Sequence, residues 1–249
     1  MHPEHDFQPL QRALRHHAEA VEIPELGSSI RTVHTLQNEA TSWDDHDRDQ
    51  VLHILLDGVA FRFVYLVGGR RHIDDVFGPG SICNAERIKK TEHRSNMHFK
   101  RGAKVALMDP ARFSALLREA PSFAEAIERQ EDARAQRLWQ RVRTLISLPA
   151  SHRVTILLLD LVDEFLVSDP SKDWVPLALT QEEIADMLGL TEVHVNRVLA
   201  RMEQAGEVER KRGAFRLPNA PRLRQQLDYR RTTAAAHNQD AAIRGEQNL

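Results

Sequence analysis

Asn196 and Arg197 are neighbours in a stretch whose apolar residues recur at the spacing of a helix. At about 100° per residue, one face of this predicted helix carries Val195, Val198, Leu199 and Met202, and the opposite face carries Val193, Asn196, Arg197 and Ala200. An amide and a guanidinium are the side chains best shaped for bidentate hydrogen bonds to adenine and guanine in the major groove of DNA. The pair therefore predicts base recognition, with a merely solvated helix surface as the alternative.

The residues before this helix predict another helix that meets it at a sharp angle. Thr180 and Glu183 have the spacing of a capping box, in which each side chain accepts a hydrogen bond from the backbone N–H of the other residue. Gly189 suits the left-handed position that ends a helix, and Thr191 can cap the helix that follows. Two helices joined in this way predict a helix-turn-helix.

A basic hairpin is predicted after the second helix. The stretch GEVERKRGAFRLP, residues 206–218, reads as two short strands with Arg210, Lys211 and Arg212 at the tip. Residues 194–216 hold six basic and three acidic side chains, a net charge of +3 in a chain whose formal net charge is −2. Basic groups at a wing tip suit phosphate contacts, which position a protein on DNA without reading its sequence. The hairpin therefore favours DNA binding over the solvated-surface alternative.

The elements that must hold this unit come earlier in the chain. From about Ile30 to Met108, short apolar runs are cut by turn signals, and every second residue from Val59 to Val67 is apolar, as in a strand with one inner face. Asp57-Gly58, Gly68-Gly69 and GPGS at 78–81 are typical of turns. The region predicts a small antiparallel β-roll or jelly-roll, and the fold class is then α+β.

A long helix is predicted between the roll and the helix-turn-helix, because residues 122–147 contain no glycine or proline and Pro149 follows. Apolar residues of this helix fall roughly on one stripe, which we predict to be a dimerisation face: Ile127, Leu138, Val142 and Leu145, with Ile146 beside them. The alternative is a helix that packs only along its own roll. An apolar helical stretch over residues 152–167 follows.

Composition narrows the classes of function. With 41% apolar and 28% charged residues, the chain reads as a globular protein, and no apolar run reaches the roughly 18 residues that a membrane helix needs. The first residues, MHPEHDFQPLQ, lack the features of an export signal, so we expect a cytoplasmic protein without a membrane partner. Paired carboxylates, a nucleophile elbow and a phosphate-binding loop are not recognisable, so we expect no enzymatic activity.

Cys83 is the single cysteine of the chain. One thiol cannot form an internal disulfide or supply the cysteine set of an iron–sulfur cluster. The 13 histidines show no spacing typical of a metal site. We therefore expect neither a metal nor a cofactor, and the commoner role of one cysteine in an apolar run is a small buried thiol.

In their order, the roll, the long helix and the winged helix resemble the CRP/FNR family of bacterial transcription regulators over roughly Gln50 to Leu223. The matching stretches are DGVAFRFVYLVGGRRHIDDVFGPGSIC, the long helix before Pro149, and LTQEEIADMLGLTEVHVNRVLARMEQAGEV. The resemblance implies a cyclic-nucleotide-binding-like sensory roll and a homodimer joined along the long helix. Two recognition helices would then lie in successive major grooves of a near-palindromic operator, with half-sites about 34 Å apart. A contact with RNA polymerase is a further expectation for a regulator that activates.

The implied domains follow these elements. Residues 1–122 are the sensory roll, 123–148 the dimerisation helix and 149–228 the winged helix-turn-helix domain. Residues 229–249 are a tail rich in Ala, Gln and Asn, with too little apolar content to fold alone.

The resemblance also implies DNA-contacting positions. They are Thr180, Gln181, Thr191, Glu192, Val193, His194, Asn196, Arg197, Arg201, Lys211 and Arg212. Arg197 matches the family's base-reading arginine and should contact guanine, while Asn196 adds an amide for adenine. Val193 stands where many members hold a glutamate that reads cytosine, so the base preference should differ. Glu192 could accept a hydrogen bond from a cytosine amine or lie only at the edge of the groove.

The residues of the predicted sensory roll leave several possibilities for its effector. Arg94 and Ser95 resemble the pair that binds the phosphate in members that sense cyclic nucleotides, but Ala85 stands where their ribose-binding glutamate would be, and Glu86 is one residue away. Residues 87–104 hold seven basic side chains against one acidic, which either attract an anion or are exposed loop charges. Cys83 lies where a carbon monoxide sensor of the family binds haem. A third possibility is a regulator of this family that needs no effector and is controlled by its own abundance.

A different class of function also stays open. The chain could be a sensor for a small molecule, such as a cyclic nucleotide or another anion, whose winged helix docks a protein. Selection of DNA from random sequence, against capture of a stable protein partner, distinguishes the two classes.

Overall fold

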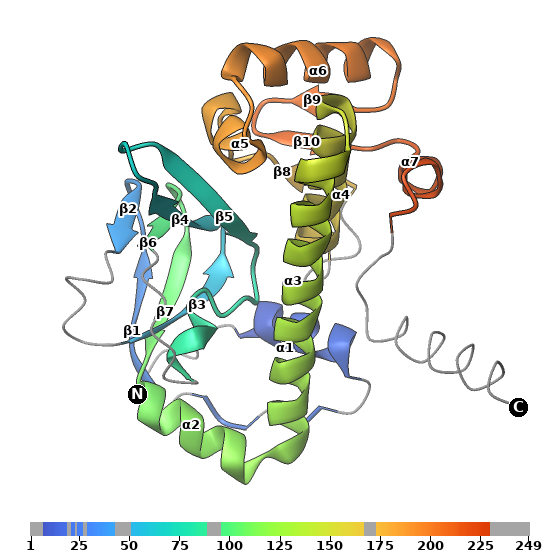
Figure 1. Cartoon of the computed structure of the whole chain (residues 1–249). Coiled ribbons are helices and arrows are strands. Elements are labelled where there is room, and N and C mark those ends of the chain that lie inside the picture. Colours follow the sequence, from blue (N-terminus) through green and yellow to red (C-terminus); the bar gives the residue numbers. More distant parts are fainter. Residues whose placement is uncertain are drawn as a thin grey trace, which may run out of the picture.

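The computed structural model describes residues 7–18, 21–22, 24–26, 29–42, 51–88, 96–166 and 173–229. A β-roll lies beside the long helix α3 (Pro121–Ser147), and a winged-helix unit lies at the C-terminal end of this helix (Figure 1). Helix α3 begins two residues before the predicted range of 123–148 and ends one residue before its end. This combination of helices and antiparallel sheets confirms the α+β class.

Two antiparallel sheets form the roll. One has the strand order β1 (Ile30–Thr35), β7 (Lys104–Met108) and β3 (Leu52–Asp57), and the other β2 (Ala40–Ser42), β6 (Asn96–Phe99), β4 (Ala60–Tyr65) and β5 (Arg71–Phe77). Gly58 connects β3 to β4 with a φ of +88°, and a Cβ there would lie 2.7 Å from the Cα of Ala103. Only glycine fits this turn, because it tolerates the left-handed backbone and leaves room for the neighbouring strand.

The roll is held by two apolar clusters. Side chains from both sheets meet in its interior: Leu55, Ala60, Phe77, Cys83, Met97, Phe99, Ala103 and Val105. A second cluster packs residues of β3 and β7 against α1 (Gln8–His17), α2 (Pro110–Glu119) and the first turns of α3. The turn after β5 leads into the short 3-10 helix η3 (Ala85–Arg87).

Ile127 lies in this second cluster and is only 5% exposed, packed with Leu10, Leu14 and Phe123 of its own chain. Its prediction as part of a dimerisation face is therefore wrong. The helical period puts Ile127 on one stripe with Leu138 and Leu145, but α1 covers the first turns of α3 and leaves the later turns open.

The aromatic face of β4 is covered by the winged-helix unit and not by the interior of the roll. Phe61 and Phe63 are buried in one cluster with residues of α4 (Ala150–Leu166), α5 (Gln181–Leu188) and α6 (Glu192–Gln204). The predicted alternation thus holds up to Phe63. It fails at Tyr65 and Val67, which are exposed, because the strand ends at Tyr65.

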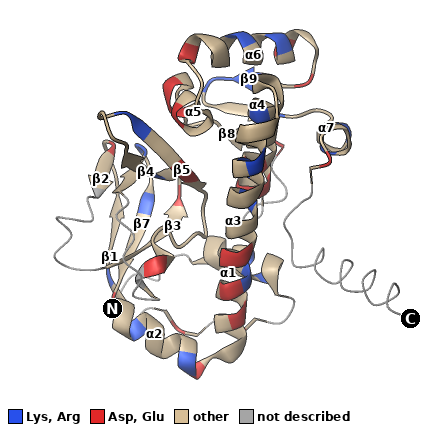
Figure 2. Cartoon of the chain, viewed as in Figure 1, with Lys and Arg blue, Asp and Glu red and all other residues tan. Residues whose placement is uncertain are grey.

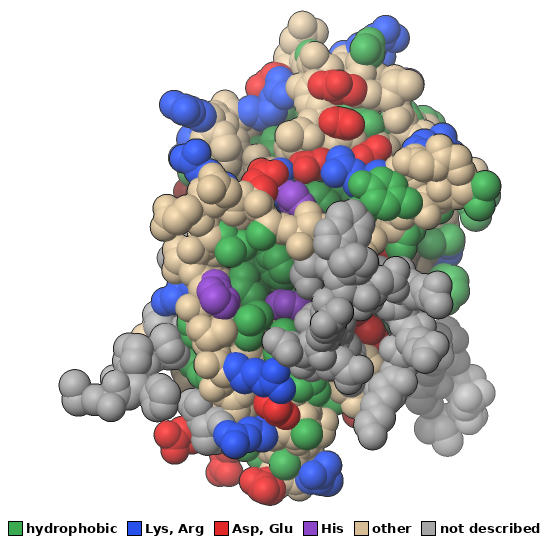
Figure 3. Space-filling model, turned by 90° about the vertical axis from the view of Figure 1, so that its left-hand side faces the viewer, with side chains coloured by type: hydrophobic (Ala, Val, Ile, Leu, Met, Phe, Trp, Pro, Cys, Tyr) green, Lys and Arg blue, Asp and Glu red, His purple; other side chains and the backbone are tan. Residues whose placement is uncertain are grey.

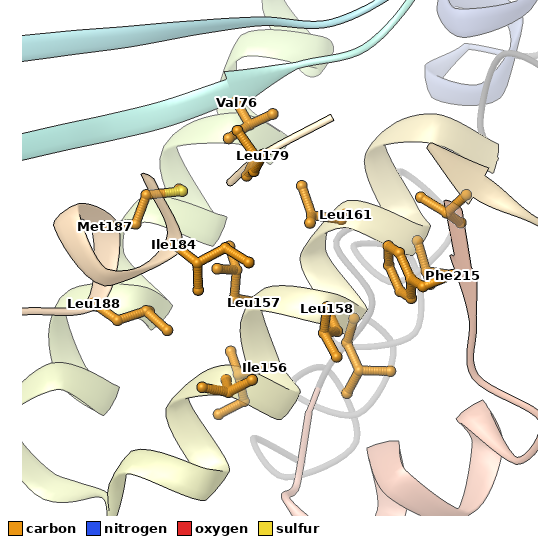
Figure 4. Close-up of a cluster of buried hydrophobic side chains, with 14 of the residues drawn as sticks. Val76, Ile156, Leu157, Leu158, Leu161, Leu179, Ile184, Met187, Leu188 and Phe215 are labelled. Carbon is orange, nitrogen blue, oxygen red and sulfur yellow. The ribbon is translucent and has the colours of Figure 1, made fainter. Parts of the chain in front are cut away.

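The winged-helix unit completes the fold. After α4 come β8 (Val175–Pro176), α5, α6, β9 (Glu209–Lys211), β10 (Ala214–Arg216) and α7 (Ala220–Gln226). The wing is a sheet of three strands, in the order β8-β10-β9, so it has one strand more than the predicted hairpin. Figure 4 shows its core, where side chains of α4 and α5 meet Phe215 of the wing and Val76 of the roll.

Tyr229, which the sequence assigns to the tail, belongs to the folded unit. Its side chain is buried, and its hydroxyl donates hydrogen bonds to Asp160 Oδ1 at 2.8 Å and Asp163 Oδ2 at 3.0 Å. The two carboxylates of α4 hold the chain one residue beyond the predicted boundary. The rest of the predicted tail lies outside the described residues. Among the helices that the structure describes, none has the length and apolar character needed to span a membrane.

Candidate nucleic-acid interface

Helix α5 begins and ends as the sequence predicts. Thr180 Oγ1 accepts a hydrogen bond from the backbone N–H of Glu183 at 3.1 Å, and Glu183 Oε2 accepts one from the backbone N–H of Thr180 at 2.8 Å. Gly189 has a φ of +62°, so the chain leaves the helix in the left-handed region. These local contacts confirm the capping box and fix the point where the turn to α6 begins.

Helix α6 presents the predicted faces. Thr191 Oγ1 caps it by accepting a hydrogen bond from the backbone N–H of His194 at 3.3 Å. The inner face is buried, as predicted: Val195, Val198, Leu199 and Met202. Because these residues pack into the same cluster as α4 and α5, the opposite face has to point away from the protein. Figure 1 shows α6 at the outer end of the molecule.

The predicted DNA-contacting residues of α6 are all exposed: Thr191, Glu192, Val193, His194, Asn196, Arg197 and Arg201. In the part of the chain that the structure describes, the side chains of Asn196 and Arg197 form no hydrogen bond or ion pair. Their donors and acceptors therefore remain available to base edges. Val193 is 68% exposed, so its side chain is available for contact with a thymine methyl group.

The wing keeps only part of its predicted basic tip. Arg210 does not extend outward, because its guanidinium binds the carboxylate of Glu203 in α6 and holds the pKa of that carboxyl below its usual range. Lys211 and Arg212 are exposed, and Lys211 Nζ lies 4.0 Å from the centroid of the Trp174 ring. Figure 2 shows the remaining basic positions along α6 and the wing. Lys211 and Arg212 are thus the phosphate-contact candidates.

At the start of α5 the two predicted contacts differ. Thr180 is exposed, although its hydroxyl oxygen already accepts the capping hydrogen bond. Gln181, the first residue of the helix, is half-buried. Both lie at a helix N-terminus, where partial positive charge favours a phosphate.

Charged pairs fix the helix-turn-helix to the roll. Lys100 Nζ lies 3.0 Å from Glu183 Oε1 in a buried ion pair, and Arg71 Nε donates to Asp186 Oδ2 at 2.8 Å. In the space-filling view of Figure 3, acidic and basic side chains are interspersed across this junction, above a mainly hydrophobic stretch of the roll. Lys100 is therefore neither an exposed loop charge nor a group open to an anionic effector, because the winged-helix unit covers it.

The predicted effector residues are only partly described. Arg94 and Ser95 lie outside the described residues. Cys83 is buried in the roll interior, where burial raises the pKa of its thiol, so that it stays protonated at neutral pH. Ala85 is buried, and the carboxylate of Glu86 lies 3.7 Å from the guanidinium of Arg62. Within the described ranges, no three His, Cys, Asp or Glu side chains are grouped as a metal site requires.

The later turns of α3 expose an apolar face. Trp139 is 67% and Ile146 83% exposed, Val142 is exposed, and Leu138 and Leu145 are half-buried. A cavity of about 440 Å³ opens beside this face, between α3 and the strands β4 and β5. The sequence prediction missed Trp139, although it continues a helical stripe with Ala135, Val142 and Ile146. Trp174 was also missed, because no local pattern predicts its contact with Lys211.

Comparison with known proteins agrees with this arrangement. Residues 152–226 match the family model described as a Crp-like helix-turn-helix domain. The nitrogen fixation regulation protein FixK of Bradyrhizobium diazoefficiens is 24% identical over 205 residues, which cover 82% of this chain and 85% of that protein. The transcriptional regulatory protein btr of Bordetella pertussis is 23% identical over 157 residues, 63% of this chain and 65% of that protein.

Solved structures share this fold over most of the chain. FixK2 from Bradyrhizobium japonicum superposes with a TM-score of 0.65 at 18% identity, over 78% of this chain and 96% of that one. A CooA mutant from Carboxydothermus hydrogenoformans superposes with a TM-score of 0.63 at 18% identity, over 84% and 93%. Residues 152–226 are thus a Crp-like helix-turn-helix domain, and the related regulators and the shared fold show a DNA-binding transcription regulator similar to those of the CRP/FNR family.

Proposed function

We propose that this DNA-binding regulator acts in the cytoplasm as a homodimer on a near-palindromic operator, with Arg197 and Asn196 reading bases. The observation that carries this proposal is the outer face of α6. It combines an exposed amide and an exposed guanidinium on a helix whose opposite face is fully buried. A rigid helix with such a face fits the major groove.

The apolar face of α3 supports the dimer. A large exposed tryptophan and isoleucine on one helix face are typical of a partner interface, because such residues are costly to leave in water. The adjacent cavity offers room for side chains of a second α3. Since α6 lies at the C-terminal end of α3 (Figure 1), the two long helices have to run parallel to bring both α6 helices to one side of the DNA.

Lys211, Arg212 and the start of α5 take the supporting role in this proposal. Their polar groups flank α6, are exposed except for the half-buried Gln181, and suit phosphate contacts, which hold the protein in register. Whether the bound dimer activates or represses depends on a contact with RNA polymerase, and transcription in vitro from a template carrying the selected operator distinguishes the two.

Selection of duplexes from a random library by the purified full-length protein tests the proposal. We expect enrichment of a palindrome whose half-site centres lie about one helical turn apart. The variant Asn196→Ala/Arg197→Ala should lose this preference, while Glu128→Ala, an exposed change on α3, should keep it. No enriched sequence, together with capture of a stable protein partner, would instead favour the protein-docking function.

Parallel selections with cyclic AMP and with cyclic GMP address the sensor. Enrichment of the same palindrome with and without nucleotide supports a regulator that needs no cyclic nucleotide. Enrichment only with nucleotide would show that Arg94 and Ser95 still bind phosphate although Ala85 replaces the usual glutamate.

A further inference from the structure

Glu164, in the last turn of α4, inserts its carboxylate between the roll and the long helix. Four donors bind its two oxygens: Oε1 accepts from the backbone N–H of Gly78 at 3.0 Å, from Ser81 Oγ at 2.7 Å and from Arg134 Nη2 at 2.9 Å, and Oε2 accepts from Arg137 Nη2 at 2.6 Å. The side chain is 8% exposed. A carboxylate of the winged-helix unit is thus enclosed by groups that all belong to other elements.

These donors are of the kinds that bind small anions. A backbone N–H and a hydroxyl from a glycine-rich turn are combined with two guanidinium groups, and charge-assisted hydrogen bonds of this kind are the strong ones. Two of the donors come from the turn at 78–81 and two from α3. None comes from α4, so the donors form a site for which α4 supplies only the anion.

Arg134 is held in the site by contacts that do not involve Glu164. Arg134 Nη1 donates to Asp75 Oδ2 at 3.0 Å and to the carbonyl of Val76 at 3.3 Å, and its guanidinium lies 4.3 Å from the centroid of the Phe77 ring. These contacts hold one of the two guanidinium groups against β5. Arg137, in contrast, has Glu164 as its ion-pair partner, so removal of this carboxylate leaves a buried cation uncompensated.

The turn accepts α4 at close range. A Cβ at Gly78 would lie 3.1 Å from Cδ1 of Phe165 and 3.3 Å from Cγ of Glu164. Glycine at this position therefore lets the last turn of α4 approach the backbone N–H that the carboxylate needs.

We propose that Glu164 is a built-in anionic ligand, which occupies an anion site formed by the turn at 78–81 and α3 and thereby holds the winged-helix unit on the roll without a small-molecule anion. The chemical class that fits the site is a small monocarboxylate, which Glu164 supplies from within the chain. As a statement about regulation, this inference rests on the proposed function. The anion site itself is argued only from the four hydrogen bonds that Glu164 accepts.

The test uses full-length Glu164→Ala, which opens the site, with Glu128→Ala as an exposed control. Thermal unfolding is measured against sodium formate and sodium acetate, with chloride added so that the ionic strength stays constant. We expect the Tm of Glu164→Ala to rise with either carboxylate, since a ligand that binds only the folded state stabilises it. The Tm of the wild type and of Glu128→Ala should respond equally to carboxylate and chloride. An equal response of Glu164→Ala to formate, acetate and chloride would overturn the proposal.

Operator binding provides the second readout. Glu164→Ala should bind the selected operator at least about tenfold more weakly than the wild type and recover with acetate, whereas the loss of a merely structural contact would not be reversed by an anion. A failure to select any operator would contradict the proposed function. The anion site would still be tested, because the unfolding assay contains no DNA.

Glu164→Gln keeps the test decisive if the alanine variant does not fold. The glutamine side chain has nearly the shape of glutamate but no charge, so it still occupies the anion site. We expect a lower Tm than that of the wild type and no specific response to acetate. A Tm equal to that of the wild type would contradict the inference, because the charge of Glu164 would then contribute nothing to holding α4.

Discussion

Arg197 is the residue at which sequence recognition can be tested most directly. It is exposed on the outer face of α6, and in the proposed function its guanidinium forms bidentate hydrogen bonds with guanine. Arg197→Ala should weaken operator binding by about 1 to 3 kcal/mol and relax the preference at one base pair of each half-site. Binding to operators substituted at each position measures this. Arg212→Ala is the matched control, since loss of a phosphate contact weakens binding to all sequences alike, and a uniform loss for Arg197→Ala would reassign it to the backbone.

Glu164 should make stability depend on pH. Burial alone would raise the pKa of Glu164, but Arg134, Arg137 and the hydrogen bonds of the site outweigh burial and lower it from the ordinary value of 4.5 to about 2. A carboxyl whose pKa is lower in the folded state contributes stability above the unfolded pKa and loses it as the pH falls through the folded one. Relative to Glu164→Gln, this contribution should amount to about 3 kcal/mol at pH 7 and disappear between pH 4.5 and 2.

Urea unfolding of wild type and Glu164→Gln from pH 7 downward measures that difference. Other buried acids, such as Asp160, whose pKa burial raises, also contribute to the pH dependence of stability. They are common to both proteins, so they largely cancel in the difference. If the difference in unfolding free energy between the wild type and Glu164→Gln stayed constant with pH, ionisation of Glu164 would not contribute to stability, and the prediction would be wrong.

At the scale of elements, one side chain of α5, Glu183, both caps its own helix and binds the roll. Glu183 caps its own helix through Thr180 and pairs with Lys100, which follows β6. A helix that must present α6 to DNA is thereby fixed to the roll at its first turn. The orientation of the outer face of α6 relative to the roll depends on this pair and on the one between Arg71 and Asp186.

Removal of Lys100 should therefore destabilise the protein. Lys100→Met leaves the buried carboxylate of Glu183 without its cation, and breaking a buried ion pair on one side costs about 3 kcal/mol. Lys104→Met is a suitable control, because Lys104 forms no ion pair in the described part of the chain. Chemical denaturation gives both values, and equal unfolding free energies for the two variants would show that the pair does not hold the units together.

At the scale of the whole molecule, the proposed homodimer depends on the apolar face of α3, which would bring two α6 helices to one operator. Trp139→Asp/Ile146→Asp should yield a folded monomer, because both side chains are exposed and contribute little to their own chain. Without the second α6, affinity for the full palindrome should fall at least about a hundredfold, since linked binding sites reinforce each other to that extent. Sedimentation at operator-binding concentrations checks the mass, and a variant that stays dimeric would place the interface elsewhere.

Contacts within a few residues were predictable from the sequence. The capping box of Thr180 and Glu183, the left-handed Gly189 and the two faces of α6 depend on helical spacing and backbone geometry, which short stretches specify. These features were enough to predict the helix-turn-helix, while the apolar runs and turn signals between Ile30 and Met108 predicted the roll. The wing was predicted less well, because Arg210 turns to Glu203 in α6 and β8 joins the sheet from an earlier part of the chain.

The sequence by itself determined which residues form amphipathic faces, and tertiary structure decided what covers each face. Spacing marks Phe61 and Ile127 equally as inward residues, but only the path of the chain brings α4 and α5 over the first and α1 over the second. In the same way, Lys100 meets Glu183 across 83 residues, and Glu164 meets Gly78 across 86. The sequence around a charged residue does not tell whether its side chain is exposed to solvent or buried in an ion pair. Burial of the charge becomes favourable only once folding brings its partner within hydrogen-bonding distance.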